Sequence, residues 1–167
     1  MTPRTGKQSR DRGEAFEADL LTAYRPDHVY LQRTSPPWRY VRKGRTLAVV
    51  VVEEGVPDFH GAIDGRAVVL DAKATGDARW ELRNIDADLA THLDTAHARG
   101  VVAGILLRWD ASGAVYWLPW QALGPLWHGW RRGIARHGEA SITPRDAGQL
   151  GREVRGMRWW EAVQVSC

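Results

Sequence analysis

The chain has 167 residues, of which 44% are hydrophobic and 26% are charged. A chain of this length buries about two-thirds of the surface that its unfolded form exposes, so one compact core suffices and a mostly disordered chain is excluded. The net charge is +3 and arginine dominates over lysine. This balance permits a nucleic-acid partner, because guanidinium groups bind phosphates bidentately.

Cys167 is the single cysteine, so neither an intrachain disulfide nor a zinc site built from cysteine ligands can form. We therefore expect a cytoplasmic protein. The longest apolar run, Leu47 to Val52, is too short to cross a bilayer, and no signal-peptide h-region follows Met1. Neither membrane insertion nor secretion is expected.

Residues 1–12 are basic and lack apolar periodicity, which predicts a flexible basic arm that is either simply solvated or ordered by DNA. A helix is predicted at residues 14–25, because Phe16 and Leu20 share one helical face and a proline follows. Glu17 lies in the first two turns of this helix. A favourable interaction with the helix dipole is the alternative to a chemical role for Glu17.

A short strand is predicted at residues 29–32, and the Pro36-Pro37 pair after it enforces an extended segment. Basic and aromatic residues then alternate, which suits contact with phosphates and unstacked bases. A solvent-exposed hairpin tip is the alternative. The predicted DNA-binding residues are Arg39, Arg42, Lys43 and Arg45.

Leu47 to Val52 is a β-branched run typical of a strand buried on both faces. Two paired strands are predicted after it, joined by the turn Asp64-Gly65, because this dipeptide between apolar runs is a strong hairpin signal. The two strands occupy residues 56–63 and 66–73.

The second half of the chain predicts two helices and two strands before it becomes irregular beyond Gly133. The third predicted helix of the chain carries an aromatic stripe, interpreted as core or subunit interface rather than a base-stacking platform. The pair Trp159-Trp160 is expected to hold the tail against the body. The predicted elements are a helix at 84–99, strands at 101–108 and 114–118, and a helix whose stripe is Trp120, Leu123, Trp127 and Trp130.

Three charged residues of the predicted hairpin form a candidate active site. Asp71 and Lys73 are two positions apart on one strand, so both project from the same face. Asp58 on the partner strand and Asp71 are nearly equidistant from the turn, which places the two carboxylates opposite each other. Such a pair repels itself and persists most readily where a cation neutralises it.

Carboxylate oxygens suit Mg²⁺, with Mn²⁺ as an alternative, and the predicted metal ligands are Asp58, Asp71 and the backbone carbonyl of Ala72. Lys73 would orient or help deprotonate the attacking water and offset phosphate charge. The alternative is a surface hairpin with an ordinary Asp–Lys ion pair. The spacing alone is frequent by chance, but its strand–turn–strand placement between two helices is not.

This ordered series resembles the PD-(D/E)XK nuclease superfamily, and within it most closely the RecU-type Holliday-junction resolvases. The resemblance spans about residues 12–125, most of the chain. The matching segments are Arg12-Gly13-Glu14-Ala15-Phe16-Glu17, Gly55-Val56-Pro57-Asp58-Phe59-His60-Gly61, Leu70-Asp71-Ala72-Lys73-Ala74-Thr75, Leu82-Arg83-Asn84-Ile85 and Gly100-Val101-Val102-Ala103-Gly104-Ile105-Leu106-Leu107.

The resemblance implies an α/β fold of the restriction-endonuclease type, with a mixed central sheet flanked by helices, in a single domain over residues 13–167. It also implies a basic stalk-like protrusion at about residues 36–46 that enters the junction. A homodimer would cut two strands of a four-way junction symmetrically, leaving 5′-phosphate and 3′-hydroxyl ends. By the same resemblance, the catalytic residues are the metal ligands Asp58 and Asp71, the catalytic lysine Lys73 and the additional acid Glu17.

The chain departs from the family pattern at two positions. Asp71 stands where the family usually has Glu, and the family's His-Gln pair falls near Asp88-Leu89, so the expected Gln is missing. His92, one turn further on, is either its substitute or a partly buried residue paired with Asp88.

Three functions follow from these observations. The first is a structure-selective, metal-dependent DNA endonuclease that resolves Holliday junctions. The second is a nuclease of the same fold with another DNA target, of the repair or restriction type. The third, a catalytically inactive DNA-binding module, is disfavoured because a decayed site has no reason to keep Glu17, Asp58, Asp71 and Lys73 together.

Overall fold

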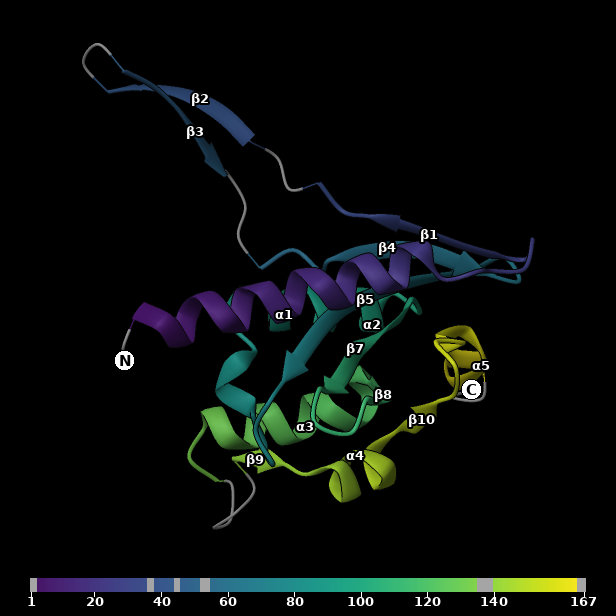
Figure 1. Ribbon diagram of the computed structural model, residues 1–167. Coiled ribbons are helices and arrows are strands. Elements are labelled where there is room, and N and C mark those ends of the chain that lie inside the picture. Colours follow the sequence, from purple (N-terminus) through teal and green to yellow (C-terminus); the bar gives the residue numbers. More distant parts are fainter. Residues whose placement is uncertain (1–2, 36–37, 44–45, 52–54, 135–139, 165–167) are drawn as a thin grey trace.

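A computed structural model describes residues 3–35, 38–43, 46–51, 55–134 and 140–164, and the side chains of 10–35, 55–134 and 140–163 among them. A six-stranded sheet with the order β1-β4-β5-β7-β8-β10 forms its centre. Helix α1 (Pro3–Thr22) covers one face of the sheet, and α2 (Ala87–Ala98) and α3 (Trp120–Arg131) cover the other (Figure 1). The predicted α/β fold with a mixed sheet flanked by helices is confirmed.

Five of the six strands of the central sheet lie where strands were predicted, and β10 is the exception. Among the described pairings, β5 and β7 run parallel, because α2 carries the chain across the sheet between them, and their neighbours pair antiparallel. The strands are β1 (Val29–Arg33), β4 (Phe59–Ile63), β5 (Arg66–Thr75), β7 (Val102–Trp109), β8 (Ala114–Pro119) and β10 (Arg152–Val154).

The hairpin of β4 and β5 forms as predicted. Asp64 and Gly65 both have positive φ, 48° and 76°, as a two-residue turn between twisted strands requires. Phe59 pairs with Leu70, so Asp58 continues the register opposite Asp71. Strand β4 begins later than predicted, at Phe59, because Pro57 has no N–H to donate to the ladder. Asp58 therefore lies just beyond the end of the strand.

The sheet separates two apolar cores. On one face Phe16 and Leu20 of α1 pack against residues of the sheet that include Leu106, with α5 (Trp159–Gln164) beside them. On the other face Leu89 of α2 and the predicted stripe of α3 pack against Ile105 and Leu107. Alternation along β7 thus supplies both cores. Trp120, Leu123 and Trp127 are buried, so the prediction that the stripe is core is confirmed.

Strands β2 (Trp38–Lys43) and β3 (Thr46–Val51) pair with each other in a separate two-stranded sheet. Figure 1 shows this ribbon extending away from the body of the molecule, and it spans most of the predicted protrusion. Leu47 to Val52 was interpreted as a strand buried on both faces. The strand β3 does form there, but it is not part of the central sheet, so this part of the interpretation was wrong. β-branched residues favour extended backbone in either setting.

The two ends of the chain contain more regular structure than predicted. Helix α1 begins at Pro3, so residues 3–12 of the predicted flexible arm are helical. Beyond Gly133, strand β10 and helices α4 (Pro144–Leu150) and α5 replace the predicted irregular tail. The capping box of Thr143 and Asp146 at the start of α4 was a readable signal.

The remaining described elements are short. Strand β6 (Trp80–Glu81) pairs with β9 (Ser141–Ile142), and the 3-10 helix η1 (Leu82–Asn84) precedes α2. The predicted role of Trp159 and Trp160 is confirmed, because both side chains are buried in the α1 core.

Candidate active site

Asp58 and Asp71 meet at the open end of the β4–β5 hairpin, where β4 begins and β5 continues past it. The backbone N–H of Ala72 donates a hydrogen bond of 2.8 Å to Asp58 Oδ2. Because the N–H and C=O of one strand residue point to the same edge, the Ala72 carbonyl is directed to the edge on which Asp58 lies. The structure therefore brings together the three groups predicted as metal ligands.

Lys73 lies beside Asp71 at the same place. Its Nζ is 2.6 Å from Asp71 Oδ2, and the Asp71 side chain is only 3% exposed. That oxygen accepts no hydrogen bond of suitable geometry from the described residues, so the contact is an electrostatic one. A surface hairpin with an ordinary Asp–Lys ion pair does not describe this arrangement.

The electrostatics of the pair follow from its burial. Burial raises the pKa of Asp71 to about 7, the Lys73 ammonium opposes the rise, and the Asp58 carboxylate adds to it. For Lys73, burial alone would lower the pKa, but the neighbouring Asp71 carboxylate outweighs it and the pKa is raised. The Asp71 carboxylate thus favours the ammonium form of Lys73.

Glu17 approaches this pair from α1. Its side chain is largely buried and contacts the guanidinium of Arg33. Burial and the Asp58 carboxylate raise the pKa of Glu17, while Arg33 and Lys73 act in the opposite direction. Glu17 thus belongs to the same electrostatic cluster as the hairpin residues, which is the neighbourhood that the family resemblance implied for it.

Sequence reasoning missed Arg33. It ends β1 and pairs with Phe59 at the start of β4, which places its guanidinium beside the acid cluster. The signal was absent from the local sequence, because the pairing of β1 with β4 joins segments that are far apart in the chain.

The donor set fits a hard divalent cation. Within the described ranges, no group of three or more His, Cys, Asp and Glu side chains is arranged to hold a metal. Two carboxylates and a carbonyl are present instead, and Mg²⁺ is commonly bound by one or two carboxylates together with several waters. A cation bound there would satisfy the buried Asp71 oxygen that lacks a hydrogen bond and would offset the repulsion from Asp58.

Three of the predicted DNA-binding residues belong to β2, a strand that carries no residue of the acid cluster. Arg39, Arg42 and Lys43 are on β2, opposite Val50, Leu47 and Thr46 of β3. Their side chains and the whole of Arg45 fall outside the part of the chain that is described. His92 is partly buried on α2.

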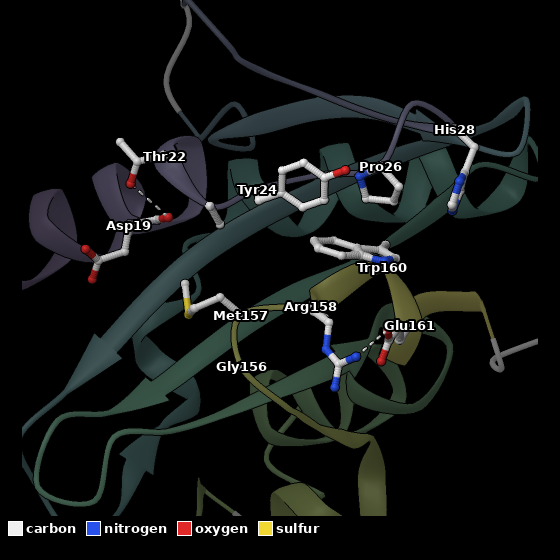
Figure 2. Close-up of a pocket in the computed structure, with 11 residues that line it drawn as sticks. Asp19, Thr22, Tyr24, Pro26, His28, Gly156, Met157, Arg158, Trp160 and Glu161 are labelled. Carbon is white, nitrogen blue, oxygen red and sulfur yellow. Dashed lines mark hydrogen bonds and ion pairs between the residues drawn. The ribbon is translucent and has the colours of Figure 1, made fainter.

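A cavity of about 790 Å³ lies between the C-terminal end of α1 and α5. Figure 2 shows Tyr24, Met157 and Trp160 around it. The predicted catalytic and metal-binding residues are not among those that line it. The chemistry described above therefore lies outside this cavity, at the open end of the β4–β5 hairpin.

Residues 26–149 match the family model of Recombination protein U, RecU. The chain belongs to the RecU family. This confirms the resemblance found in the sequence, and the match extends it toward the C-terminus. The matched range contains Asp58, Asp71 and Lys73 but begins after Glu17.

The structure of this RecU chain is similar to that of Archaeoglobus fulgidus Hjc, a Holliday junction resolvase from an archaeal hyperthermophile. The TM-score is 0.52 at 18% sequence identity, over 82% of this chain and 93% of that chain. At this identity the likeness shows a shared fold. No curated protein matches the RecU chain.

Proposed function

We propose that this RecU-family protein is a metal-dependent DNA endonuclease that resolves four-way junctions by hydrolysing phosphodiesters. The observation that carries the proposal is the buried Asp71 carboxylate, paired with Lys73 and close to Asp58 just before β4, in a chain of this family. The structural similarity to Hjc, itself a Holliday junction resolvase, supports the same substrate class.

The residues of the chain have distinct roles in this reaction. Asp58, Asp71 and the Ala72 carbonyl would hold Mg²⁺, or alternatively Mn²⁺, which when bound acidifies water and stabilises negative charge on phosphate. Lys73, held as an ammonium by Asp71, offsets the charge that develops on the phosphate oxygens. That Lys73 also orients the attacking water or helps to deprotonate it stays a prediction.

Hydrolysis adds a hydroxyl group to phosphorus and breaks the bond to the 3′ oxygen, which takes up a proton. The products are a 5′-phosphate and a 3′-hydroxyl. Glu17 would be the additional acid near the metal, and burial together with the Asp58 carboxylate raises its pKa. Its contact with Arg33 fixes one carboxylate oxygen and orients the side chain.

The wider assembly follows from the symmetry of the substrate. A four-way junction has two equivalent strands to cut, so a homodimer with two active sites matches it. Arg39, Arg42, Lys43 and Arg45 of the protrusion would contact the phosphates of the branched DNA. No described helix is long and apolar enough to span a membrane. The cytoplasmic location expected from the lone Cys167 stays a prediction.

Cleavage assays test the proposal. A synthetic four-way junction and a linear duplex of the same sequence are incubated with Mg²⁺ and with EDTA. We expect paired cuts in the junction, none in EDTA, and loss of cutting in Asp58→Asn. Asp27→Asn, which alters an exposed acid in the turn before β1, is the control. Equal cutting of junction and duplex would favour the nuclease with another DNA target.

A further inference from the structure

Arg108 of β7 holds helix α1 against the sheet by three contacts. Its Nη1 donates to Asp19 Oδ2 at 2.9 Å, and its Nη2 donates to the Arg12 carbonyl at 3.4 Å. The guanidinium carbon lies 4.7 Å from the centre of the Phe16 ring. The Arg108 side chain is 17% exposed, whereas its partner Asp19 is 59% exposed, so the guanidinium lies beneath the helix and reaches Asp19 at the surface.

The three contacted residues form one stripe of the helix. Positions 12, 16 and 19 have the spacing i, i+4 and i+7, which places them on a single face. A helix held along such a stripe over two turns cannot rotate about its axis. Glu17 follows Phe16 and is turned from it by about 100°, so its direction is fixed when the stripe is fixed.

Asp110, just after β7, completes the connection to the strand that carries Asp71 and Lys73. It accepts a 2.9 Å hydrogen bond from Arg108 Nε and pairs with Arg12 at 3.5 Å. Its backbone N–H donates to the carbonyl of Thr75, the last residue of β5. The Arg12 guanidinium also lies close to Gly76, where a Cβ would be 2.4 Å from its Nη1.

We propose that Arg108 is a positioning residue, which through α1 sets the place of Glu17 relative to Asp58 and Asp71. The proposal rests on the proposed nuclease function for its catalytic consequence, while the contacts themselves do not depend on it. Arg108 does not touch the acid cluster; it touches the helix stripe next to Glu17.

The test compares two variants with a matched control. Arg108→Met keeps an apolar stem over Phe16 but loses the hydrogen bonds, and Asp19→Asn weakens one contact at an exposed residue. Arg158→Met, which breaks the exposed pair with Glu161 on α5, is the control. We expect kcat for junction cutting to fall about tenfold to a hundredfold in Arg108→Met. Asp19→Asn should cause a smaller loss, and KM should stay unchanged in both.

A double-mutant cycle separates positioning from a general structural role. If Arg108 acts through Glu17, Arg108→Met has no further effect on kcat in a Glu17→Gln protein. An equal loss of kcat in both backgrounds overturns the proposal, and so does wild-type kcat in Arg108→Met.

Hydrogen exchange supplies a readout that does not depend on cleavage. The amides of residues 12–19 should exchange faster in Arg108→Met and Asp19→Asn than in the wild type, while those of α2 and those of the control stay unchanged. If the wild type cuts no junction, the proposed nuclease function is wrong. The exchange rates would still test whether Arg108 positions α1. Unchanged exchange in α1 overturns it.

Discussion

Among single residues, Asp71 is the most constrained part of the site, because its buried carboxylate depends on one neighbouring cation. The Lys73 ammonium lies 2.6 Å away, and Asp58 repels Asp71 from the other side. A buried charge that loses its partner is left without compensation and either costs free energy or binds a proton. Substitutions of this pair should therefore change both stability and activity.

The first prediction concerns Lys73→Met. We expect junction cleavage to fall by about two to three orders of magnitude, since the charge that stabilises the transition state is lost. The free energy of unfolding, measured in urea, should fall by about 1–3 kcal/mol, because Asp71 loses its counter-ion but can bind a proton. Arg83→Met removes the exposed pair with Glu81 and should cost under about 0.5 kcal/mol. Equal losses in both variants would contradict the prediction.

The second prediction concerns pH in metal-free protein. The pKa of Asp71 is about 7 in the folded state and about 3.9 in the unfolded state. Between these values the folded state binds more protons, so the contribution of Asp71 to stability falls as pH rises through this range. Unfolding in EDTA at several pH values should show a steeper decline for the wild type than for Asp71→Asn. Parallel curves would contradict the assignment.

At the scale of elements, we expect the β2–β3 ribbon to affect DNA binding and helix α1 to affect cleavage. The ribbon, which includes the basic strand β2, extends away from the body of the molecule (Figure 1). Helix α1 carries Glu17, which interacts electrostatically with Asp58 and Lys73 of the hairpin. Changes in the ribbon should therefore alter DNA affinity, and changes in α1 should alter the rate of cleavage.

The third prediction concerns the ribbon. Replacing Arg39, Arg42 and Lys43 together by Ala should weaken junction binding and reduce the slope of log affinity against log salt by about 2–3. The midpoint of thermal unfolding should stay near that of the wild type. Replacing three exposed arginines elsewhere is the control, and should change the slope little. The control positions are Arg99, Arg152 and Arg155.

At the scale of the whole molecule, the site joins three separate segments of the chain, because Glu17 lies on α1, Arg33 on β1 and the remaining residues on the β4–β5 hairpin. Cation binding to the folded state alone should stabilise the entire domain, because the unfolded chain does not bring Asp58 and Asp71 together. The protein is then more stable by a free energy that depends on the cation concentration.

The fourth prediction is that Mg²⁺ stabilises the wild type against thermal unfolding, by about 2.7 kcal/mol at a concentration one hundred times Kd. A protein with Asp58→Asn and Asp71→Asn together should show no such gain. Calorimetry with Mg²⁺ and with an equal ionic strength of NaCl makes the comparison. A gain of the same size in the double variant would place the cation elsewhere.

The fifth prediction concerns symmetry. In a dimer formed from one wild-type protomer and one Asp71→Asn protomer, one active site remains, so the junction should be nicked in a single strand. Sedimentation establishes the dimer, and denaturing electrophoresis separates nicked from paired products. Paired cuts by the mixed dimer would show that one protomer can cut both strands.

The features that the sequence determined are local in the chain. Asp64-Gly65 fixes the turn, the turn fixes the register, and the register places Asp58 opposite Asp71 with Lys73 on the same face. Helical and strand periodicity likewise determined the order of the central elements. These inferences hold because each depends on residues that are close together in sequence.

Only the tertiary structure decided the contacts between distant segments. Arg33 lies beside Glu17 because β1 pairs with β4. The hydrogen bond from Arg108 to Asp19 joins residues that are 89 positions apart. The tertiary structure also decided that β3 pairs with β2 and not with the central sheet. A β-branched run and a lone arginine favour no particular partner, so long-range packing determines which contact each one makes.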